Sequence, residues 1–185
     1  MPGKVILVGG GARSGKSRFA LEYARKLGQR RLFVATAESL DAEMQGRIVR
    51  HREERGADFA TVEEPLHLAR LLTELRDVDV VVVDCLTLWL SNLLMQETSV
   101  DDIDGQVAEM VNALRKRQRH VVLVSNEVGL GIVPESALGR VFRDLAGRTH
   151  QRLAAEADEV YLAAMGLVLR LVPDPVKAFR SGECP

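Results

Sequence analysis

The stretch "GGGARSGKSRFA" (residues 9–20) follows the apolar run "KVILV" (residues 4–8) near the start of the chain. It contains Gly10, four further residues and then Gly15-Lys16-Ser17, which is the spacing of a P-loop. Glycines suit such a loop because backbone N–H groups must converge on phosphate oxygens, and Cβ atoms would obstruct that approach. The stretch therefore predicts a nucleotide site between a strand and a helix.

Apolar runs alternate with helical patterns along the rest of the chain. We expect strands at residues 5–8, 31–36, 59–62, 78–84 and 120–125, and two more within 159–172 around Met165-Gly166. We expect helices at residues 17–27, 41–55, 65–75 (with Pro65 in the first turn), 86–96, 101–118 and 136–157.

Continuous apolar strands that alternate with helices are typical of a mainly parallel sheet covered on both faces. The predicted fold class is α/β, a P-loop NTPase (RecA-like) fold with helices on both faces of the sheet and a C-terminal antiparallel hairpin. We expect one domain, residues 1–185, in which residues 173–185 form a loosely held tail.

Composition and charge exclude several classes of function. The formal net charge is −1 at pH 7, so no overall field attracts nucleic acid or an anionic membrane. No apolar run approaches the length of a membrane span, and "KVILV" is too short for the apolar region of a signal peptide. Two cysteines, Cys85 and Cys184, do not suggest a disulfide framework. We therefore expect a cytoplasmic protein without nucleic-acid or membrane partners.

The P-loop pattern assigns chemical roles. Lys16 neutralises the β- and γ-phosphates of a nucleotide, and the Ser17 hydroxyl ligates Mg²⁺. "VVVVD" (residues 80–84) places Asp84 at the carboxyl end of a strand, where ligands bind in open α/β sheets. We interpret Asp84 as a second Mg²⁺ ligand, although aspartate also suits the N-cap of the following helix.

His51 lies within "RIVRHREER" (residues 47–55). Its helical spacing from Met44 and Ile48 is typical of a half-buried packing histidine. Four arginines nevertheless crowd it, at positions 47, 50, 52 and 55. Such a cluster would hold a polyphosphate, and it would disfavour protonation and so leave the imidazole nucleophilic. Glu53 and Glu54 could instead pair with these arginines on a solvated face, so the residues alone leave both interpretations open.

Other candidates carry weaker signals. His67 and His120 have no metal-ligand spacing with another His or Cys, so we interpret both as structural. The basic run at residues 115–119 is typical of the cationic end of a helix rather than of nucleic-acid binding. Glu127, in the loop "SNEVGLGIVPE" (residues 125–135), could act as a base, bind substrate or belong to a plain structural loop.

Several stretches in this order resemble one known family. They are "GGGARSGKSRFALEYA", "VATAESLDAEMQGRIVRHREER", "TVEEP", "VVVDCLTLWLSNLL", "VSNEVGLGIVPE" and "FRDLAGRTHQRLAAEADEVYL". The family is the bifunctional adenosylcobinamide kinase/adenosylcobinamide-phosphate guanylyltransferase family of cobalamin biosynthesis. The resemblance extends from Val5 to about Val172. Its specific parts are the segment around His51 and the "NEVGLGIVP" loop.

The resemblance implies that the chain phosphorylates the aminopropanol arm of adenosylcobinamide with ATP or GTP and Mg²⁺. It then transfers GMP from GTP to the new phosphate through a covalent guanylyl-histidine, which falls on His51. The resemblance also implies a cytoplasmic homo-oligomer, a homotrimer. The nucleotide contacts that it implies fall on Gly10, Gly11, Ala12, Arg13, Ser14, Gly15, Lys16, Ser17, Ala35, Thr36, Ala37, Arg52, Glu53, Glu54, Arg55, Glu63 and Asp84.

One residue departs from the family pattern. In "GRTHQ" (residues 147–151) the family usually has asparagine where this chain has His150, which puts the role of that helix in doubt. Two other readings of the P-loop remain: a single-activity kinase for a small metabolite, in which His51 is structural, and a nucleotide-dependent switch without an acceptor.

Overall fold

A computed structural model describes residues 2–37, 56–96, 98–173 and 177–180 of the chain, the last segment by its backbone alone. The strands in this part are β1 (Val5–Gly10), β2 (Arg31–Ala35), β3 (Ala60–Glu63), β4 (Val80–Asp84), β5 (His120–Asn126), β6 (Glu159–Ala164), β7 (Leu167–Val172) and β8 (Lys177–Arg180). The helices are α1 (Lys16–Leu27), the short 3-10 helix η1 (Gly56–Asp58), α3 (Leu68–Glu74), α4 (Leu86–Met95), α5 (Val100–Arg115) and α6 (Ala137–Glu156). The helix expected at residues 41–55 lies outside the described residues.

The described strands form one sheet in the order β3-β2-β4-β5-β1-β6-β7-β8. The first six strands in this order, from β3 at the edge to β6, run parallel to one another. Strands β7 and β8 are antiparallel to their neighbours. The predicted α/β class, the mainly parallel sheet and the C-terminal hairpin are confirmed. Strand β8 was not expected, since it falls within the segment predicted as a loose tail.

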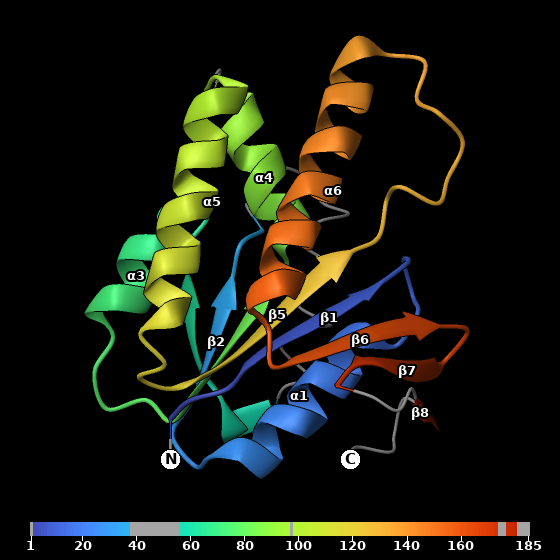
Figure 1. Ribbon diagram of the computed structural model, residues 1–185. Helices are drawn as coiled ribbons and strands as arrows, with labels where there is room; N and C mark the ends of the chain where they lie inside the picture. Colours follow the sequence, from blue (N-terminus) through green and yellow to red (C-terminus); the bar gives the residue numbers. More distant parts are fainter. Residues whose placement is uncertain (1, 38–55, 97, 174–176, 181–185) are drawn as a thin grey trace.

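The sheet separates two hydrophobic cores (Figure 1). Successive residues of a strand point to opposite faces, so Val5 and Leu7 of β1 pack toward α3 to α6, while Ile6 and Val8 pack toward α1. Burial on both faces explains why the central strands are apolar throughout. The predicted covering of both faces by helices is therefore confirmed.

Two predicted element ends are wrong for local reasons. Pro65 does not lie in the first turn of a helix, because the Glu64 carboxylate accepts the N–H groups of Leu66 and His67 and α3 begins only at Leu68. Helix α5 ends at Arg115 instead of residue 118, because Arg117 adopts a left-handed φ of 48° that cannot continue the helix.

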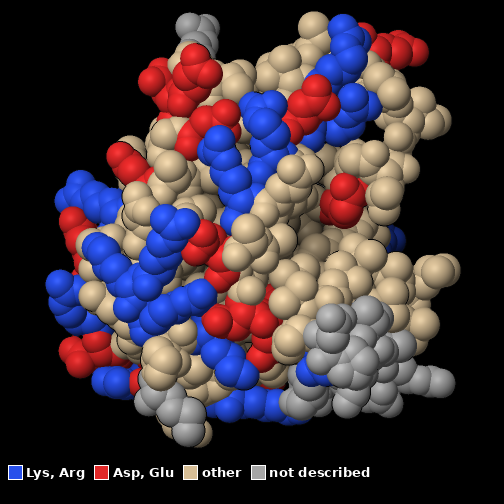
Figure 2. All heavy atoms as spheres, viewed as in Figure 1, with Lys and Arg blue, Asp and Glu red and all other residues tan. Residues whose placement is uncertain are grey.

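The basic run at residues 115–119 forms ion pairs and a helix cap. Arg115 pairs with Glu156, and Arg117 pairs with Asp158. Figure 2 accordingly shows basic and acidic side chains interspersed over the side of the molecule that carries α3 and α5. The run is therefore committed to contacts within the chain, in agreement with its predicted structural role.

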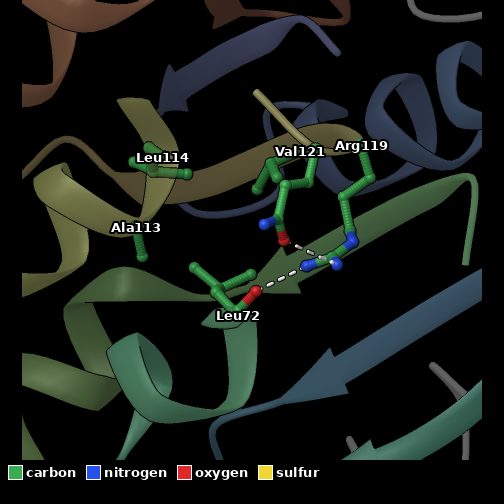
Figure 3. A pocket seen from close by; sticks show the side chains of 6 residues that line it. Leu72, Ala113, Leu114, Arg119 and Val121 are labelled. Carbon is green, nitrogen blue, oxygen red and sulfur yellow. Dashed lines mark hydrogen bonds between the residues drawn. The ribbon is translucent and has the colours of Figure 1, made fainter. Parts of the chain in front are cut away.

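Arg119 completes the same region. Its guanidinium donates a hydrogen bond to the carbonyl oxygen of Leu72 (Figure 3) and another to that of Leu75, at the end of α3. The small cavity beside it has a volume of about 10 Å³, room for one water molecule. Because it is lined by side chains at the start of β5, it lies at the opposite edge of the sheet from the P-loop and is no candidate for a substrate site.

A buried carboxylate fixes α1 to the sheet. Glu159, only 7% exposed, accepts hydrogen bonds from Tyr23 (2.5 Å), Tyr161 (2.8 Å) and the Lys4 ammonium (2.8 Å). Burial raises the pKa of Glu159, but these three donors outweigh it, and the net pKa is lowered. The cluster joins α1 and β6 to Lys4, the residue directly before β1, by hydrogen bonds to a charged carboxylate.

Tyr23→Phe is expected to lower the free energy of unfolding by about 1–3 kcal/mol, because the buried carboxylate loses a charge-assisted hydrogen bond. Urea-induced unfolding followed by circular dichroism measures the change. Arg70→Ala is the control, since it removes an exposed ion pair with Glu74 and should change stability much less. Equal losses in the two variants would contradict the assignment.

Candidate functional site

The P-loop joins β1 directly to α1. Gly10 has a φ of 157°, and a Cβ atom there would lie 2.4 Å from the carbonyl oxygen of Ala163 in β6. Gly15 has a φ of 95° and occupies the N-cap of α1 without any side-chain cap. The first N–H groups of α1 are therefore left to an external acceptor, as an anion site at a helix N-terminus requires.

Two polar side chains face the inside of this loop. Lys16 is 8% exposed, and its Nζ atom donates a hydrogen bond to the carbonyl oxygen of Gly11 at 3.2 Å. The Ser14 hydroxyl is buried and has no hydrogen-bond partner among the described residues. A buried cation and a buried hydroxyl without a partner fit a loop that receives an anion, because a phosphate oxygen would satisfy both.

Asp84 ends β4 and lies on the same edge of the sheet, separated from β1 by β5. Burial raises the pKa of the neighbouring Cys85 thiol, and the negative charge of Asp84 raises this pKa further. The positive charge of Lys16 lowers the same pKa, so the charges of Asp84 and Lys16 both act on the Cys85 thiol. A serine hydroxyl and a carboxylate are the hard oxygen ligands that Mg²⁺ prefers. Among the described residues there is no cluster of three or more histidine, cysteine, aspartate or glutamate side chains that could hold a metal ion.

Thr36, expected to contact nucleotide, is buried with 0% exposure. Its hydroxyl donates to the Cys85 carbonyl oxygen at 2.7 Å and accepts the Cys85 N–H at 2.8 Å. Its own carbonyl oxygen accepts a hydrogen bond from Asn92 at 2.8 Å. The Thr36 side chain is thus committed to the backbone of Cys85, the residue that follows Asp84.

The remaining site residues expected on and directly after β2 and β3 lie at the same edge of the sheet as Asp84. In the register of the sheet Ala35 lies between Glu63 and Asp84, and Thr36 and Ala37 follow directly. The other expected site residues, His51 and Arg52 to Arg55, lie outside the described residues.

The end of β5 contributes Asn126, which sequence reasoning missed, beside the candidate Glu127. Asn126 donates to the Thr87 hydroxyl at 2.9 Å and contacts the Cys85 sulfur at 3.6 Å. The Glu127 N–H donates to the Gly10 carbonyl oxygen at 3.0 Å, which fastens β5 to the P-loop. The signal that could have found Asn126 is a run of polar residues directly after an apolar strand.

The carboxylate of Glu127 organises its own loop. Its two oxygens accept the N–H groups of Gly129 at 2.8 Å and Leu130 at 2.9 Å. These contacts favour the loop-forming interpretation of Glu127 among the alternatives left open by the sequence.

His150, the residue that departs from the family pattern, lies on α6. Its Nε2 atom is 2.6 Å from the hydroxyl of Ser125, a fully buried residue at the end of β5. Burial lowers the pKa of His150, with Glu127 opposing the shift. The histidine therefore joins α6 to the strand that lies beside the P-loop.

The family model described as cobinamide kinase / cobinamide phosphate guanyltransferase matches residues 6–171. The chain belongs to this family. It is 42% identical over 180 residues to the bifunctional adenosylcobalamin biosynthesis protein CobU of Salmonella typhimurium, covering 90% of this chain and 99% of that protein. It is also 42% identical over 171 residues to the corresponding CobP of Pseudomonas aeruginosa, covering 92% and 98% of the two chains. The resemblance inferred from the motifs is confirmed.

Solved structures support the fold. The RadB recombinase aligns with a TM-score of 0.55 at 17% identity, over 97% of this chain and 87% of that chain. A protein from Pyrococcus horikoshii OT3 aligns with a TM-score of 0.55 at 11% identity, over 94% and 89%. At such identities the likeness shows the fold alone, which agrees with the RecA-like class. In the described part of the chain, no helix combines the length and hydropathy needed to cross a bilayer.

Stability should depend on pH through His150. Because its folded-state pKa is lowered, protonation favours the unfolded chain, and the free energy of unfolding should fall as pH falls below about 6.5. His150→Asn should remove this part of the pH dependence, measured by urea unfolding between pH 5 and 8. His67→Asn, on an exposed residue, should retain it. Indistinguishable pH profiles for wild type and His150→Asn would refute the assignment.

Thr36→Val should weaken Mg²⁺-dependent nucleotide binding, because Asp84 loses the hydroxyl that holds its neighbouring peptide. Two hydrogen bonds of about 1 kcal/mol each, about 2 kcal/mol together, predict a rise of up to about thirtyfold in the Mg²⁺ concentration for half-maximal binding. Thr36→Ser, which keeps the hydroxyl, should stay near wild type. A loss of melting temperature in Thr36→Val with unchanged Mg²⁺ dependence would assign Thr36 a purely structural role.

Proposed function

We propose that this chain phosphorylates the hydroxyl of the aminopropanol arm of adenosylcobinamide and then transfers GMP from GTP to the new phosphate, giving adenosylcobinamide-GDP. The observation that carries the proposal is the P-loop with Asp84 on the same sheet edge, in a chain whose family model spans residues 6–171. The relatives' names, bifunctional adenosylcobalamin biosynthesis proteins, support both reactions.

The residues proposed for the kinase reaction all lie in the part of the chain that the structure describes. Lys16 and the N–H groups at the start of α1 would hold the phosphates of ATP or GTP, and Ser17 and Asp84 would hold Mg²⁺. The bound metal would neutralise charge on the phosphate oxygens. The main contribution of the protein is then positioning and electrostatic stabilisation, because phosphoryl transfer asks for little covalent chemistry from side chains.

The second reaction needs a nucleophile, and His51 is the candidate. Its imidazole nitrogen would attack the α-phosphorus of GTP, so that a P–N bond forms and pyrophosphate leaves. An oxygen of the acceptor phosphate would then attack the same phosphorus, breaking the P–N bond and releasing His51. Arg52 and Arg55 would stabilise the charge that develops on the phosphate oxygens. The sequence around His51 and the family support this assignment.

The proposal also covers the oligomeric state, the cellular location and the partners of the enzyme. We infer a cytoplasmic homotrimer, as the family resemblance implies, without nucleic-acid or membrane partners.

GTP labelled at the α-phosphorus should label the wild-type protein covalently, with release of pyrophosphate. The bond should be labile in acid and persist in base, since protonated imidazole is a good leaving group. His51→Asn keeps a polar side chain but cannot attack phosphorus, so it should lose the label and still phosphorylate adenosylcobinamide. Gel autoradiography and a kinase assay measure the two properties.

Lys16→Ala is the complementary variant. It should lose kinase activity, because the β- and γ-phosphates lose their fixed cation. If His51→Asn still accumulates label from the α-phosphate, or label appears only from the γ-phosphate, the covalent mechanism is wrong and a single-activity kinase replaces it.

A further inference from the structure

Exposed apolar side chains gather on the two connections that flank the P-loop and on the first turns of α6, which begins farther from that loop (Figure 1). Among the described residues, seven of the ten large apolar side chains that are exposed lie on the β5–α6 and β6–β7 connections and the element starts next to them. We call this set the apolar rim. It consists of Leu130 (85% exposed), Ile132 (97%), Val133 (59%), Leu138 (56%), Val141 (39%), Met165 (94%) and Leu167 (45%).

The two parts of the rim flank the phosphate loop. Strands β5 and β6 are the two neighbours of β1, and all three run in parallel, so both connections leave the sheet at the edge where the P-loop begins. In Figure 1 the end of β1 lies between the β5–α6 connection and the β6–β7 turn. Direct contacts join them, because Gly10 accepts the Glu127 N–H and packs against the Ala163 carbonyl.

The β5–α6 connection is held in shape although its apolar side chains face solvent. Glu127 binds the N–H groups of Gly129 and Leu130, and the Ser136 hydroxyl accepts the Gly139 N–H at 3.1 Å. The Arg140 guanidinium donates to the carbonyl oxygens of residues 134 and 135, at 3.0 and 2.6 Å. A fixed backbone that presents exposed Leu130 and Ile132 lowers the entropy lost when a ligand covers them.

We propose that the apolar rim binds the corrin ring of the acceptor. This inference rests on the proposed function. The reacting hydroxyl sits on a short arm and must reach the γ-phosphate at the P-loop, so the ring must lie directly beside that loop. A corrin ring is a broad macrocycle whose edge carries methyl groups between amide side chains, and flanking apolar side chains would cover the face of the ring and these methyl groups. The nucleotide phosphates, in contrast, need the N–H groups and Lys16 at the start of α1.

The test compares wild type with the double variant Leu130→Ser/Ile132→Ser. The Leu130 and Ile132 side chains are too exposed to contribute to the hydrophobic core, so their replacement should leave the fold intact. The control is Leu171→Ser, an exposed leucine near the end of β7, at the opposite edge of the sheet. Three quantities are measured: the dissociation constant of adenosylcobinamide by equilibrium dialysis, the KM for nucleotide in the kinase reaction, and the molecular mass by light scattering.

The double variant should bind adenosylcobinamide about tenfold more weakly, since two side chains lose apolar contact, with unchanged nucleotide KM and unchanged mass. The control should match wild type throughout. Unchanged adenosylcobinamide affinity in the double variant would overturn the inference. A fall in molecular mass would overturn it as well, because the rim would then be a contact between copies of the chain.

Failure of the proposed function gives a different result. A wild-type protein that binds adenosylcobinamide but phosphorylates it with neither ATP nor GTP would refute the kinase reaction, while weaker binding by the double variant would still support the rim.

Discussion

The close packing of Gly10 against the Ala163 carbonyl is the constraint on which the site depends. No other residue type fits there without moving β6 or the loop, because a Cβ atom would lie 2.4 Å from a backbone oxygen. The same glycine gives its carbonyl oxygen to the Glu127 N–H. Three neighbouring strands are therefore joined at one point, from which the P-loop leads to the N-terminus of α1, whose first N–H groups have no side-chain cap.

A second set of contacts holds the acidic side of the site. Thr36, Cys85, Thr87 and Asn126 form a chain of hydrogen bonds across the ends of β2, β4 and β5. Each bond contributes modestly, but a buried polar group that loses its partner is costly, so the chain acts as a unit. This chain of hydrogen bonds holds the residue that directly follows Asp84.

The strand order divides the surroundings of the P-loop by chemistry. Glu63, Ala35 and Asp84 lie together on β3, β2 and β4, whereas the apolar rim extends from β5 and β6. Within the proposed function, the metal would be held on the β4 side of the P-loop strand, while the apolar rim flanks the loop through β5 on that side and through β6 on the other.

The sequence by itself determined the α/β class, the P-loop with Lys16 and Ser17, the strand that carries Asp84 and the C-terminal hairpin. These features depend on local spacing and on apolar periodicity, which the chain displays directly. Only the tertiary structure decided that Thr36 is buried against Cys85, that His150 meets Ser125, and that Met165 and Leu130 flank the same loop. Those facts depend on strand order and on contacts between distant residues, and neither is encoded in the neighbourhood of any single residue.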